Sequence, residues 1–366
     1  MQVTGTAVLT IEPGVTIQFS QKNGGLRIAS NSTINAEGTA ANHIRFVGPT
    51  GNKGSWRGLQ IESTTPNILK YVDILNAGSE ERNSSAALYF DNGKANINNC
   101  LIDASLANGI TMQSSDSELL SFSNNVISNC DRAPVYTGSR VGPYSLRLME
   151  NSNTFTGNAN AYIHISDDWS NNATTGDMAL PHLNGYPWFF ESGLIIGNGA
   201  VQAIEFTIEP GAVLLMGENT SININGYSHL IARGTAQKRI TVKGINDQKG
   251  YWKGIAVSSK TPGTIFDYCD ISNGGRNRNS EANSGIICYA EYSIYLEIYN
   301  TSLNRSLTHG LTCYYSNTIS NSSYSCYLKH ANVTFSEIEK YVFFISWENK
   351  GYTSLPTMGS DWWRWF

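Results

Sequence analysis

The chain has 366 residues, only 15% of them charged, and a formal net charge of −4; ordinary globular proteins contain roughly 25% charged residues. Basic residues are scattered along the chain, which argues against the clustered basic face of a nucleic-acid-binding protein. No apolar run reaches the ~18 residues of a transmembrane helix, so we expect no nucleic-acid partner and no transmembrane segment.

The first predicted strands flank a corner at residues 9–19, LTIEPGVTIQF, where two alternating apolar runs meet at Glu-Pro-Gly. Pro13 suits the second position of a β-turn, since its φ is fixed at about −65°. Gly14 suits the third position of a type II turn, where φ is positive. The phrase returns as FTIEPGAVLLM at 206–216. We therefore predict the same corner at the start of two similar modules.

The rest of the chain repeats in the same order. AEGTAANHIRFVG (36–48) matches ARGTAQKRITVKG (232–244), an offset of 196 residues (232 − 36). Further matched pairs are GSWRGLQI with GYWKGIAV, YVDILNAG with YCDISNGG, and NCLIDASLANGI with NTSLNRSLTHGL. This order indicates an internal duplication, with module 1 at 1–175 and module 2 at 176–366, the latter ending in a Trp-rich tail.

Within each copy, short strands with strict apolar–polar alternation recur between Gly, Asn and Asp residues. Alternation with a period of two predicts strands rather than helices. A sandwich is an alternative, because some hairpin-type turns are present, such as Asp-Asn-Gly at 91–93. The duplication and the Asn-rich turns favour a solenoid. We predict an all-β fold of two tandem right-handed parallel β-helix modules.

Three segments carry a resemblance to a known family: LTIEPGVTIQF, AEGT followed by IRF, and WRGLQI followed by LKYVDILNAG. They resemble the right-handed parallel β-helix repeat proteins, pectate-lyase-like solenoids common on the surface of Bacteroidetes-type bacteria. The resemblance implies export, often with a lipid anchor, and no particular activity. Segment 179–196 looks like the usual lead-in to the second module, and the first module lacks one. We therefore expect an export signal ahead of Met1 in the precursor, a lipid anchor upstream as an option, and a secreted or cell-surface location.

Polysaccharide lyases and glycoside hydrolases need carboxylates gathered on one sheet face. Three charged pairs occupy the same place in both copies: Glu12 and Glu209, Arg57 and Lys253, Asp73 and Asp270. Since a catalytic site is rarely needed twice, we interpret these pairs as structural. Asp167 and Asp168 resemble the paired aspartates of polygalacturonase-like enzymes. His309-Gly310-Leu311 lacks the second Gly of their Gly-His-Gly motif, so a solvated turn is the favoured interpretation of the aspartates.

Histidine and cysteine spacing gives no sign of a metal site. The six histidines lack zincin spacing and the six cysteines form no CxxC pair, so we expect no metal and no cofactor. Cys269 stands where the first copy has Val72, and Cys313 where it has Met112. Free Cys packs as a small hydrophobe, and inert core thiols are therefore favoured over disulfides.

The aromatic residues fall into two groups. Trp56 and Trp252 are matched between copies and are predicted to pack on their own sheets. In CYAEYSIYLEIYN (288–300), alternation turns the Ile and Leu residues inward and the intervening Tyr and Glu residues outward. We predict a sugar-binding strip of Tyr295, Glu297 and Tyr299, continued by Tyr314 and Tyr327, with Tyr315 and Tyr324 on the same coils. The alternative is that these tyrosines cover loops or extend a flat sheet.

These patterns predict an exported surface protein without catalytic residues that binds a polysaccharide or surface glycan, or serves as an adhesive or structural module. The alternative is a polysaccharide lyase or glycoside hydrolase on the same fold. Ice binding is less favoured, because no regular outward Thr-x-Thr ladder is present. A carboxylate cluster on neighbouring coils would favour the enzyme, and the sequence alone does not give the coil register.

Overall fold

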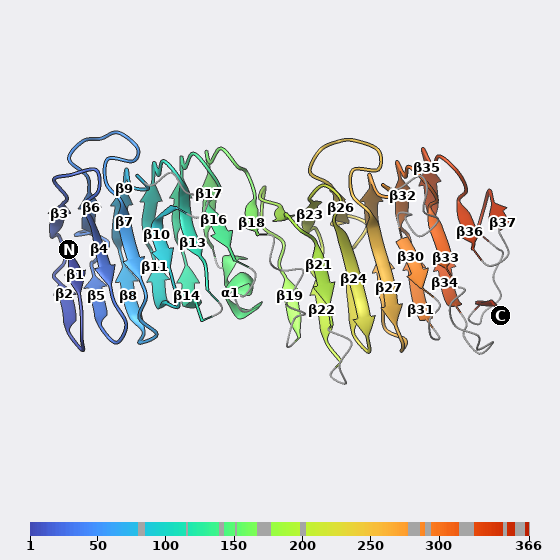
Figure 1. Ribbon diagram of the computed structural model, residues 1–366, viewed down its shortest axis with the longest axis horizontal. Coiled ribbons are helices and arrows are strands. Elements are labelled where there is room, and N and C mark those ends of the chain that lie inside the picture. The colour runs from blue at the N-terminus through green and yellow to red at the C-terminus, as the bar shows by residue number, and fades with distance from the viewer. Residues whose placement is uncertain are drawn as a thin grey trace. The chain divides into compact units, whose positions relative to one another are not determined.

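The chain is an all-β parallel β-solenoid of about 10 turns, as the computed structural model in Figure 1 shows. The structure describes residues 1–79, 85–114, 116–138, 143–150, 152–166, 177–197, 203–276, 286–289, 294–314, 326–346, 350–355 and 363–365. It divides into two compact units: unit 1 is Met1–Ser166 with Leu183–Pro187, and unit 2 is Asp167–His182 with Trp188–Phe366. Parallel pairing confirms the predicted solenoid and excludes the sandwich.

Three sheets build unit 1, each made of strands from successive coils. The first sheet, the Gln60 face, has the order β1 (Gln2–Val3), β4 (Gly25–Ile28), β7 (Gly58–Ile61), β10 (Ala86–Phe90), β13 (Asn108–Met112), β16 (Val135–Thr137) and β18 (Ile163–Ile165). The second has β14 (Glu118–Ser123), β11 (Lys94–Asn98), β8 (Asn67–Lys70), β5 (Thr33–Glu37) and β2 (Val8–Ile11). The third has β17 (Thr154–Thr156), β15 (Val126–Ser128), β12 (Leu101–Asp103), β9 (Val72–Leu75), β6 (Ile44–Val47) and β3 (Thr16–Gln18). A short helix, α1 (Pro143–Arg147), and a 3-10 helix, η1 (Leu148–Glu150), follow β16.

Unit 2 is also built from three sheets. The Ala256 face has β21 (Leu194–Ile196), β24 (Ser221–Gly226), β27 (Gly254–Ser259), β30 (Ile286–Tyr289), β33 (Leu311–Tyr314), β36 (Phe343–Ile345) and β37 (Lys350–Tyr352). The Tyr295 face has β19 (Met178–Leu180), β22 (Glu205–Ile208), β25 (His229–Arg233), β28 (Ile265–Asp267), β31 (Ile294–Tyr299), β34 (Cys326–Ala331) and β38 (Trp363–Trp365). The remaining strands are β20 (Trp188–Phe190), β23 (Val213–Met216), β26 (Ile240–Gly244), β29 (Cys269–Ser272), β32 (Ser302–Asn304) and β35 (Thr334–Ser336). The last strands of the first two sheets, β37 and β38, pair antiparallel with their neighbours.

The Glu-Pro-Gly corners have the geometry that the sequence predicts. Gly14 has a φ of 82° and Gly211 a φ of 88°, a region that glycine enters at little cost. The turn is closed by the Val15 N–H, which donates to the Glu12 carbonyl at 3.3 Å, and by the corresponding bond in unit 2 at 3.1 Å. Each corner therefore turns the chain from one sheet to the next in the first coils of its unit.

Asparagine serves a second kind of corner, between the second and third sheets of unit 1. Asn99 (φ 57°) and Asn124 (φ 55°) adopt the left-handed conformation there, which Asn tolerates better than most residues. The neighbouring Asn125 is buried. Its amide accepts the Cys100 N–H and donates to the Ile97 carbonyl, both at 2.9 Å. The Asn-rich turns thus satisfy backbone groups that would otherwise be buried without partners.

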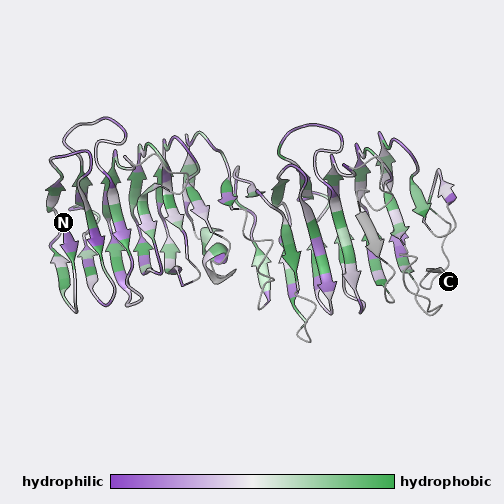
Figure 2. Ribbon diagram, viewed as in Figure 1, coloured by the Kyte–Doolittle hydropathy of each residue, from purple (hydrophilic) through white to green (hydrophobic). Residues whose placement is uncertain are grey.

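Alternating residues of each strand form the core, and Figure 2 shows apolar and polar residues alternating along many strands. On β31, Ile294, Leu296 and Ile298 are at most 1% exposed, which confirms their predicted inward orientation. Trp56 and Trp252 are fully buried. Their indole N–H groups donate to backbone carbonyls at 2.7 and 2.8 Å, so the prediction that they pack within their own units is confirmed.

The described part of the chain contains no helix with the length and apolar character needed to cross a bilayer. Helix is confined there to the short segments α1 and η1.

Candidate functional site

The predicted tyrosine strip lies mainly on the Tyr295 face. Tyr295, Glu297 and Tyr299 lie on β31 and are half-buried, and Tyr327 on β34 pairs in register with Tyr295. The rings of Tyr295 and Tyr327 stack with centroids 4.6 Å apart and planes 5° from parallel. One face of each ring is thus covered by the other tyrosine and is closed to a sugar.

Tyr299, the third tyrosine of the strip, is hydrogen-bonded to Glu297, which lies between Tyr295 and Tyr299 on β31. The Tyr299 hydroxyl donates to Glu297 Oε2 at 3.0 Å. Burial, followed by the hydrogen bond and charge of Glu297, raises the pKa of Tyr299 to about 12. The phenol therefore stays protonated at neutral pH, and it is already committed to a partner within the protein.

Tyr314 does not continue this strip, which corrects the prediction. It lies on β33 in the Ala256 face, paired with Tyr289 of β30. The coil turns between β31 and β33, so residues that follow each other in the sequence point from different sheets. Tyr315 and Tyr324 lie outside the described residues.

The matched aspartates each contact a basic side chain or a histidine of their own unit, as expected for structural residues. Asp73 Oδ1 lies 2.7 Å from His43 Nδ1. In unit 2, Arg239 donates to both oxygens of Asp270 at 2.8 Å, and the Ser302 hydroxyl also donates to this carboxylate at 2.5 Å. Each pair links neighbouring strands of its own unit.

The other residues that the sequence analysis considered for chemistry lie in the core or outside the described part. Asp167 and Asp168 are outside it. His309 is 1% exposed, and neither ring nitrogen has a hydrogen-bond partner. Burial, with a smaller contribution from Lys340, lowers its pKa to about 4. Its ring stacks on Phe344 with centroids 4.3 Å apart, so His309 is a packed core residue.

Five cysteines are buried free thiols: Cys100, Cys130, Cys269, Cys313 and Cys326. Burial raises the pKa of Cys100, Cys130 and Cys269 to about 12. Thiols that stay protonated and buried are poor nucleophiles, so Cys100, Cys130 and Cys269 have the inert role that the sequence favours, and Cys313 and Cys326 are buried in the core with them. The side chain of Cys288 lies outside the described part. Among the described residues, no group of three or more His, Cys, Asp or Glu side chains is placed to hold a metal.

A different surface, on the Gln60 face of unit 1, gathers polar and aromatic side chains that the sequence analysis missed. Register aligns seven positions on successive coils, from first to last Gln2, Arg27, Gln60, Tyr89, Thr111, Tyr136 and His164, of which Thr111 is fully buried and the others are at least partly exposed. We call this set the unit 1 row. Adjacent strands in a sheet lie ~4.8 Å apart, so the row offers hydrogen-bonding or aromatic groups at a regular spacing on either side of the buried Thr111. At its end, the rings of Tyr136 and His164 meet edge to face at 4.8 Å.

Two carboxylates flank the row on neighbouring coils. Glu62 directly follows β7 and Asp91 directly follows β10, and the backbone ladder continues through both, with N–H···O distances of 2.8 and 3.0 Å. Arg27 Nε and Nη2 donate to the two oxygens of Glu62 at 2.6 and 2.5 Å, and Gln60 Nε2 donates to Oε1 at 2.7 Å. The Ser114 hydroxyl donates to Asp91. Glu62 and Asp91 thus form a pair of carboxylates on neighbouring coils, which could not be recognised from the sequence because the coil register was unknown.

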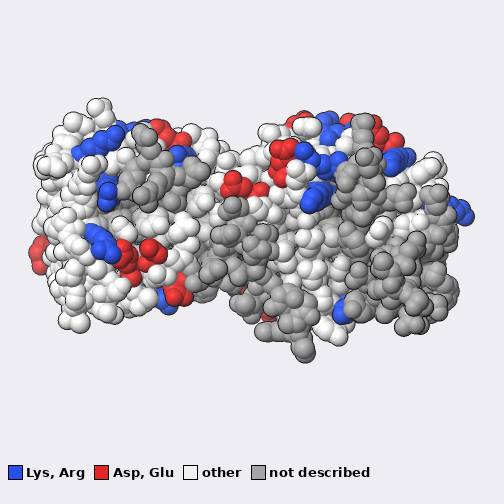
Figure 3. All heavy atoms as spheres, viewed as in Figure 1, with Lys and Arg blue, Asp and Glu red and all other residues white. Residues whose placement is uncertain are grey.

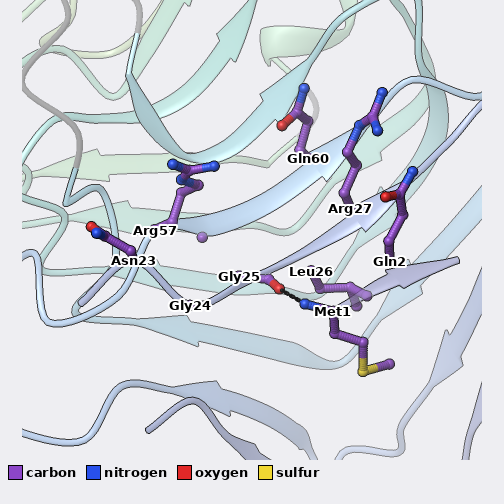
Figure 4. Close-up of a pocket in the computed structure, with 10 residues that line it drawn as sticks. Met1, Gln2, Asn23, Gly24, Gly25, Leu26, Arg27, Arg57 and Gln60 are labelled. Atoms are coloured by element: carbon purple, nitrogen blue, oxygen red, sulfur yellow. Dashed lines mark hydrogen bonds between the residues drawn. The ribbon is translucent and has the colours of Figure 1, made fainter. Parts of the chain in front are cut away.

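A pocket of about 320 Å³ opens at the start of the row (Figure 4). Its floor includes Gly25 and Gly58, where a side chain would collide with backbone: an added Cβ would lie 2.8 Å from the Gly58 carbonyl in the first case and 2.4 Å from the Ala87 carbonyl in the second. Figure 4 shows Gln2, Arg27 and Gln60 extending to the same side from three neighbouring strands. Asn23, Arg57 and Met1 also line the pocket, and the N-terminal ammonium group of Met1 donates to the Gly25 carbonyl at 2.8 Å (Figure 4).

The corresponding row of unit 2 has other chemistry. By the repeat offset and the strand register within each unit, the position of Arg27 is taken by Asn223 in unit 2. In the same way, Gln60 corresponds to Ala256, Tyr89 to Ile287 and Tyr136 to Phe344. The carboxylates Glu62 and Asp91 are replaced by Ser258 and Tyr289. The fold thus does not require the polar residues of the unit 1 row. No model of a known protein family, no curated protein and no solved structure matches this chain.

Proposed function

We propose that the protein is a non-catalytic glycan-binding protein whose principal site is the unit 1 row. The observation that carries the proposal is the in-register series Arg27, Gln60 and Tyr89, which runs from the pocket along neighbouring strands. Amide, guanidinium and phenol groups at one-strand intervals suit the hydroxyl groups of an extended polymer. Each contact is weak, so affinity depends on several coils binding together.

The hydrogen-bond partners of Glu62 favour binding over catalysis for this carboxylate. A general acid or base needs an oxygen available to exchange a proton with the substrate. Both oxygens of Glu62 already accept hydrogen bonds from Arg27 or Gln60, which suits a carboxylate that fixes the row. Glu62 thereby orients the Arg27 and Gln60 side chains toward a ligand.

A glycoside hydrolase is the second candidate, because Glu62 and Asp91 lie on adjacent coils and such enzymes use a pair of carboxylates. Turnover of a polysaccharide that falls by a factor of 100 or more, on the order expected for loss of an acid or base group, in the Asp91→Asn variant would establish this alternative. Absence of turnover in the wild type on pectins, alginates and xylans is the expected result.

The Tyr295 face is a second proposed contact surface, formed by Tyr295, Glu297, Tyr299 and Tyr327. The stacked rings of Tyr295 and Tyr327 present less ring face than a broad platform would, and the Tyr299 hydroxyl already donates to Glu297. Tyr314 on the Ala256 face is a separate proposed contact. The Tyr295→Ala, Tyr327→Ala double variant should weaken glycan binding less than changes in the unit 1 row, and an equal or larger loss would make the Tyr295 face the principal site.

The proposal also includes the module boundaries, the family type and the export that the sequence analysis predicts. We propose that the two units are tandem right-handed modules with boundaries near 1–175 and 176–366, of the pectate-lyase-like surface type. Matching Glu-Pro-Gly corners, buried tryptophans and ion pairs support it. A polysaccharide ligand would lie outside the cell, so the proposal includes export. Fractionation of the native host with an antibody to this chain tests the location, and recovery only from the cytoplasm would contradict it.

The decisive experiment compares matched variants on a glycan array and by calorimetry. The Gln60→Ala, Tyr89→Ala variant changes two positions of the unit 1 row, and we expect at least about tenfold weaker binding, since two contacts of ~1 kcal/mol each are lost. The Asn223→Ala, Ser258→Ala variant makes a similar change on the Ala256 face and should bind as the wild type does. Equal affinity of both variants and the wild type, with unchanged circular dichroism, would remove the unit 1 row as the site.

A further inference from the structure

The pocket at the start of the unit 1 row has cationic, amide and apolar side chains in its lining. Among the described residues that line it there is no carboxylate, and there are two guanidinium groups, those of Arg27 and Arg57. Both arginines are exposed, and Figure 4 shows their side chains on the same side as that of Gln60. The ammonium group of Met1, which donates to the Gly25 carbonyl, adds to the positive charge. The pocket therefore favours an anion.

The carboxylates of this face lie outside the pocket lining. On the part of unit 1 that Figure 3 shows, acidic and basic side chains are interspersed. Glu62 accepts from Nε and Nη2 of Arg27, and this hydrogen bonding contributes most to raising the pKa of Arg27. A guanidinium carries five N–H donors, so Nη1 lies outside the ion pair. Glu62 thus keeps the Arg27 guanidinium charged and fixed in direction.

The glycines of the pocket bring two strands into close contact. An added Cβ at Gly25 would lie 2.8 Å from the Gly58 carbonyl, so the backbones of β4 and β7 leave no room between them. The Arg57 N–H also donates to the Gly24 carbonyl at 2.8 Å. These backbone contacts hold Arg57 on the coil next to Arg27. A ligand group must therefore sit among the side-chain tips, in the volume of about 320 Å³.

The donors around this volume suit an anion with several oxygens. A carboxylate pairs best with the two parallel N–H groups of a guanidinium fork, and in Arg27 that fork already binds Glu62. Beside Nη1 of Arg27, the lining includes the Arg57 guanidinium and the amides of Gln2 and Asn23. Separate donors from several strands match the three terminal oxygens of a sulfate or phosphate ester.

Unit 2 keeps the fold at this place and has different chemistry. Asn223 takes the position of Arg27, and Lys253 takes that of Arg57. One cation of the pair is thus kept and the other is replaced by a neutral amide. The fold does not require two arginines here, which favours a binding role for the pair in unit 1.

We propose that the pocket binds a sulfate or phosphate ester group of the glycan, held between the guanidinium groups of Arg27 and Arg57, while the sugar chain continues past Gln60 and Tyr89. This inference rests on the proposed function and names its ligand class, a glycan that carries tetrahedral oxyanion esters. It makes Arg27 and Arg57 specificity-determining residues.

The test uses one polymer backbone in four forms. Dextran and xylan are each prepared unmodified, sulfated, phosphorylated and carboxymethylated to the same degree, and binding is measured by calorimetry and affinity electrophoresis. With at least one backbone, we expect the better ester form to bind at least about tenfold more tightly than the unmodified form and about threefold more tightly than the carboxymethylated form. Its affinity should fall between about 0.05 and 0.5 M NaCl, because exposed charges are screened. The two ester arms show which ester is bound.

Variants of matched cations locate the site. Arg57→Gln should weaken binding of the ester form at least about fivefold, through loss of a charge-assisted contact, and leave binding of the unmodified form within about twofold. Arg27→Gln should act in the same direction, but it also releases Glu62, so Arg57→Gln is the cleaner variant. Lys253→Gln is the control, since Lys253 is the equivalent exposed cation of unit 2. It should bind as the wild type does, and circular dichroism checks the fold of all three.

The outcomes distinguish the two proposals. Binding to no form of either polymer overturns the proposed function and the ligand class with it. Binding of the unmodified or carboxymethylated form as tightly as both ester forms overturns the ligand class and leaves glycan binding in place. An unchanged affinity of Arg57→Gln for the ester form, or an equal loss in Lys253→Gln, overturns the pocket as the ester site.

Discussion

The Gln60 face of unit 1 and the Ala256 face of unit 2 occupy the same place in their units, yet they carry different outward residues. Inward positions agree closely: Leu59 corresponds to Ile255, and both are nearly fully buried. Outward positions do not, since Gln60 corresponds to Ala256 and Glu62 to Ser258. Packing of the core restricts only every second residue of a strand. The outward residues are therefore free to acquire a function in one unit and lose it in the other.

Polar residues that occupy equivalent positions in the two units also differ, but less completely. His43 pairs with Asp73 in unit 1, and Arg239 pairs with Asp270 in unit 2. The aspartate is kept while its partner differs. Likewise Asn108 corresponds to His309, and both are buried to 1% exposure. The Asn108 amide donates to the Ser85 carbonyl and accepts the Ala133 N–H, whereas both nitrogens of His309 are without partners. Unit 2 thus contains a buried polar group that its own fold leaves unsatisfied.

The largest expected loss of stability concerns the buried tryptophans, which are the most similar feature of the two units. Trp56→Ala and Trp252→Ala should each lower the free energy of unfolding by about 3–5 kcal/mol, because a large buried side chain is replaced by a cavity. Since both indoles are fully buried and make equivalent hydrogen bonds, the two losses should agree within about 1 kcal/mol. Urea denaturation monitored by circular dichroism measures them. A clear difference would show that the two cores are less equivalent than their sequences.

The second prediction concerns the buried histidine of unit 2. The pKa of His309 is about 4 in the folded state and about 6.5 in an unfolded chain. The unfolded state therefore binds the extra proton first as the pH falls, and folding becomes less favourable between pH 6.5 and pH 4. We expect unit 2 to lose about 3 kcal/mol of stability over this window, and none from this group above pH 7.

Two variants isolate that effect. His309→Phe removes the titrating group and keeps an aromatic ring against Phe344, so the pH dependence in this window should shrink. Asn108→Ala in unit 1 removes a bonded amide and should lower stability by about 1–3 kcal/mol at every pH. Thermal unfolding at pH 4 to 8 measures both. The same slope in His309→Phe as in the wild type would show that another group titrates.

The third prediction compares the two ion pairs. Asp270→Ala should cost about 1–2 kcal/mol, since the carboxylate accepts two hydrogen bonds from Arg239 and one from Ser302. Asp73→Ala should cost less, because Arg45 Nε lies 3.7 Å from Asp73 Oδ2, beyond hydrogen-bond distance, and the His43 bond is shared with a partly exposed ring.

Acid titration sharpens this prediction. Arg239 lowers the pKa of Asp270 below its usual value of 3.8. The carboxylate thus contributes stability above the unfolded pKa, and that contribution is lost as the pH falls through the lower folded pKa. Because the side chain is 39% exposed, solvent screening keeps the contribution below about 1 kcal/mol. Equal acid sensitivity in Asp270→Asn and the wild type would contradict it.

Local features of this fold could be predicted from the sequence, and those that depend on coil register could not. Pro13 and Gly14 determine their turn by their own backbone preferences, and the alternation in 294–299 determines which residues face the core. Tyr314 does not continue the tyrosine strip as predicted, because the path of the chain from β31 to β33, which lies in another sheet, is not encoded in any short pattern. Gln60 and Tyr89 are 29 positions apart (89 − 60) and become neighbours only through strand pairing. Alternation does place each of them outward, so the missing information was which strands are adjacent.

The smallest expected effect concerns the corner glycines. Gly14→Ala and Gly211→Ala should each cost about 1 kcal/mol, because alanine is strained at a φ of 82° or 88°. An added Cβ at Gly211 would lie 3.3 Å from His182 Nδ1, whereas at Gly14 the nearest atom is Asn42 Cβ at 3.6 Å. Gly211→Ala should therefore be the more destabilising by a few tenths of a kcal/mol, about the cost of a small side-chain shift. Paired thermal melts of both variants, with Gly51→Ala as a control where no atom lies within 4 Å, measure the difference. A larger loss for Gly14→Ala would mean that the first corner carries more of its unit's stability than the local contacts show.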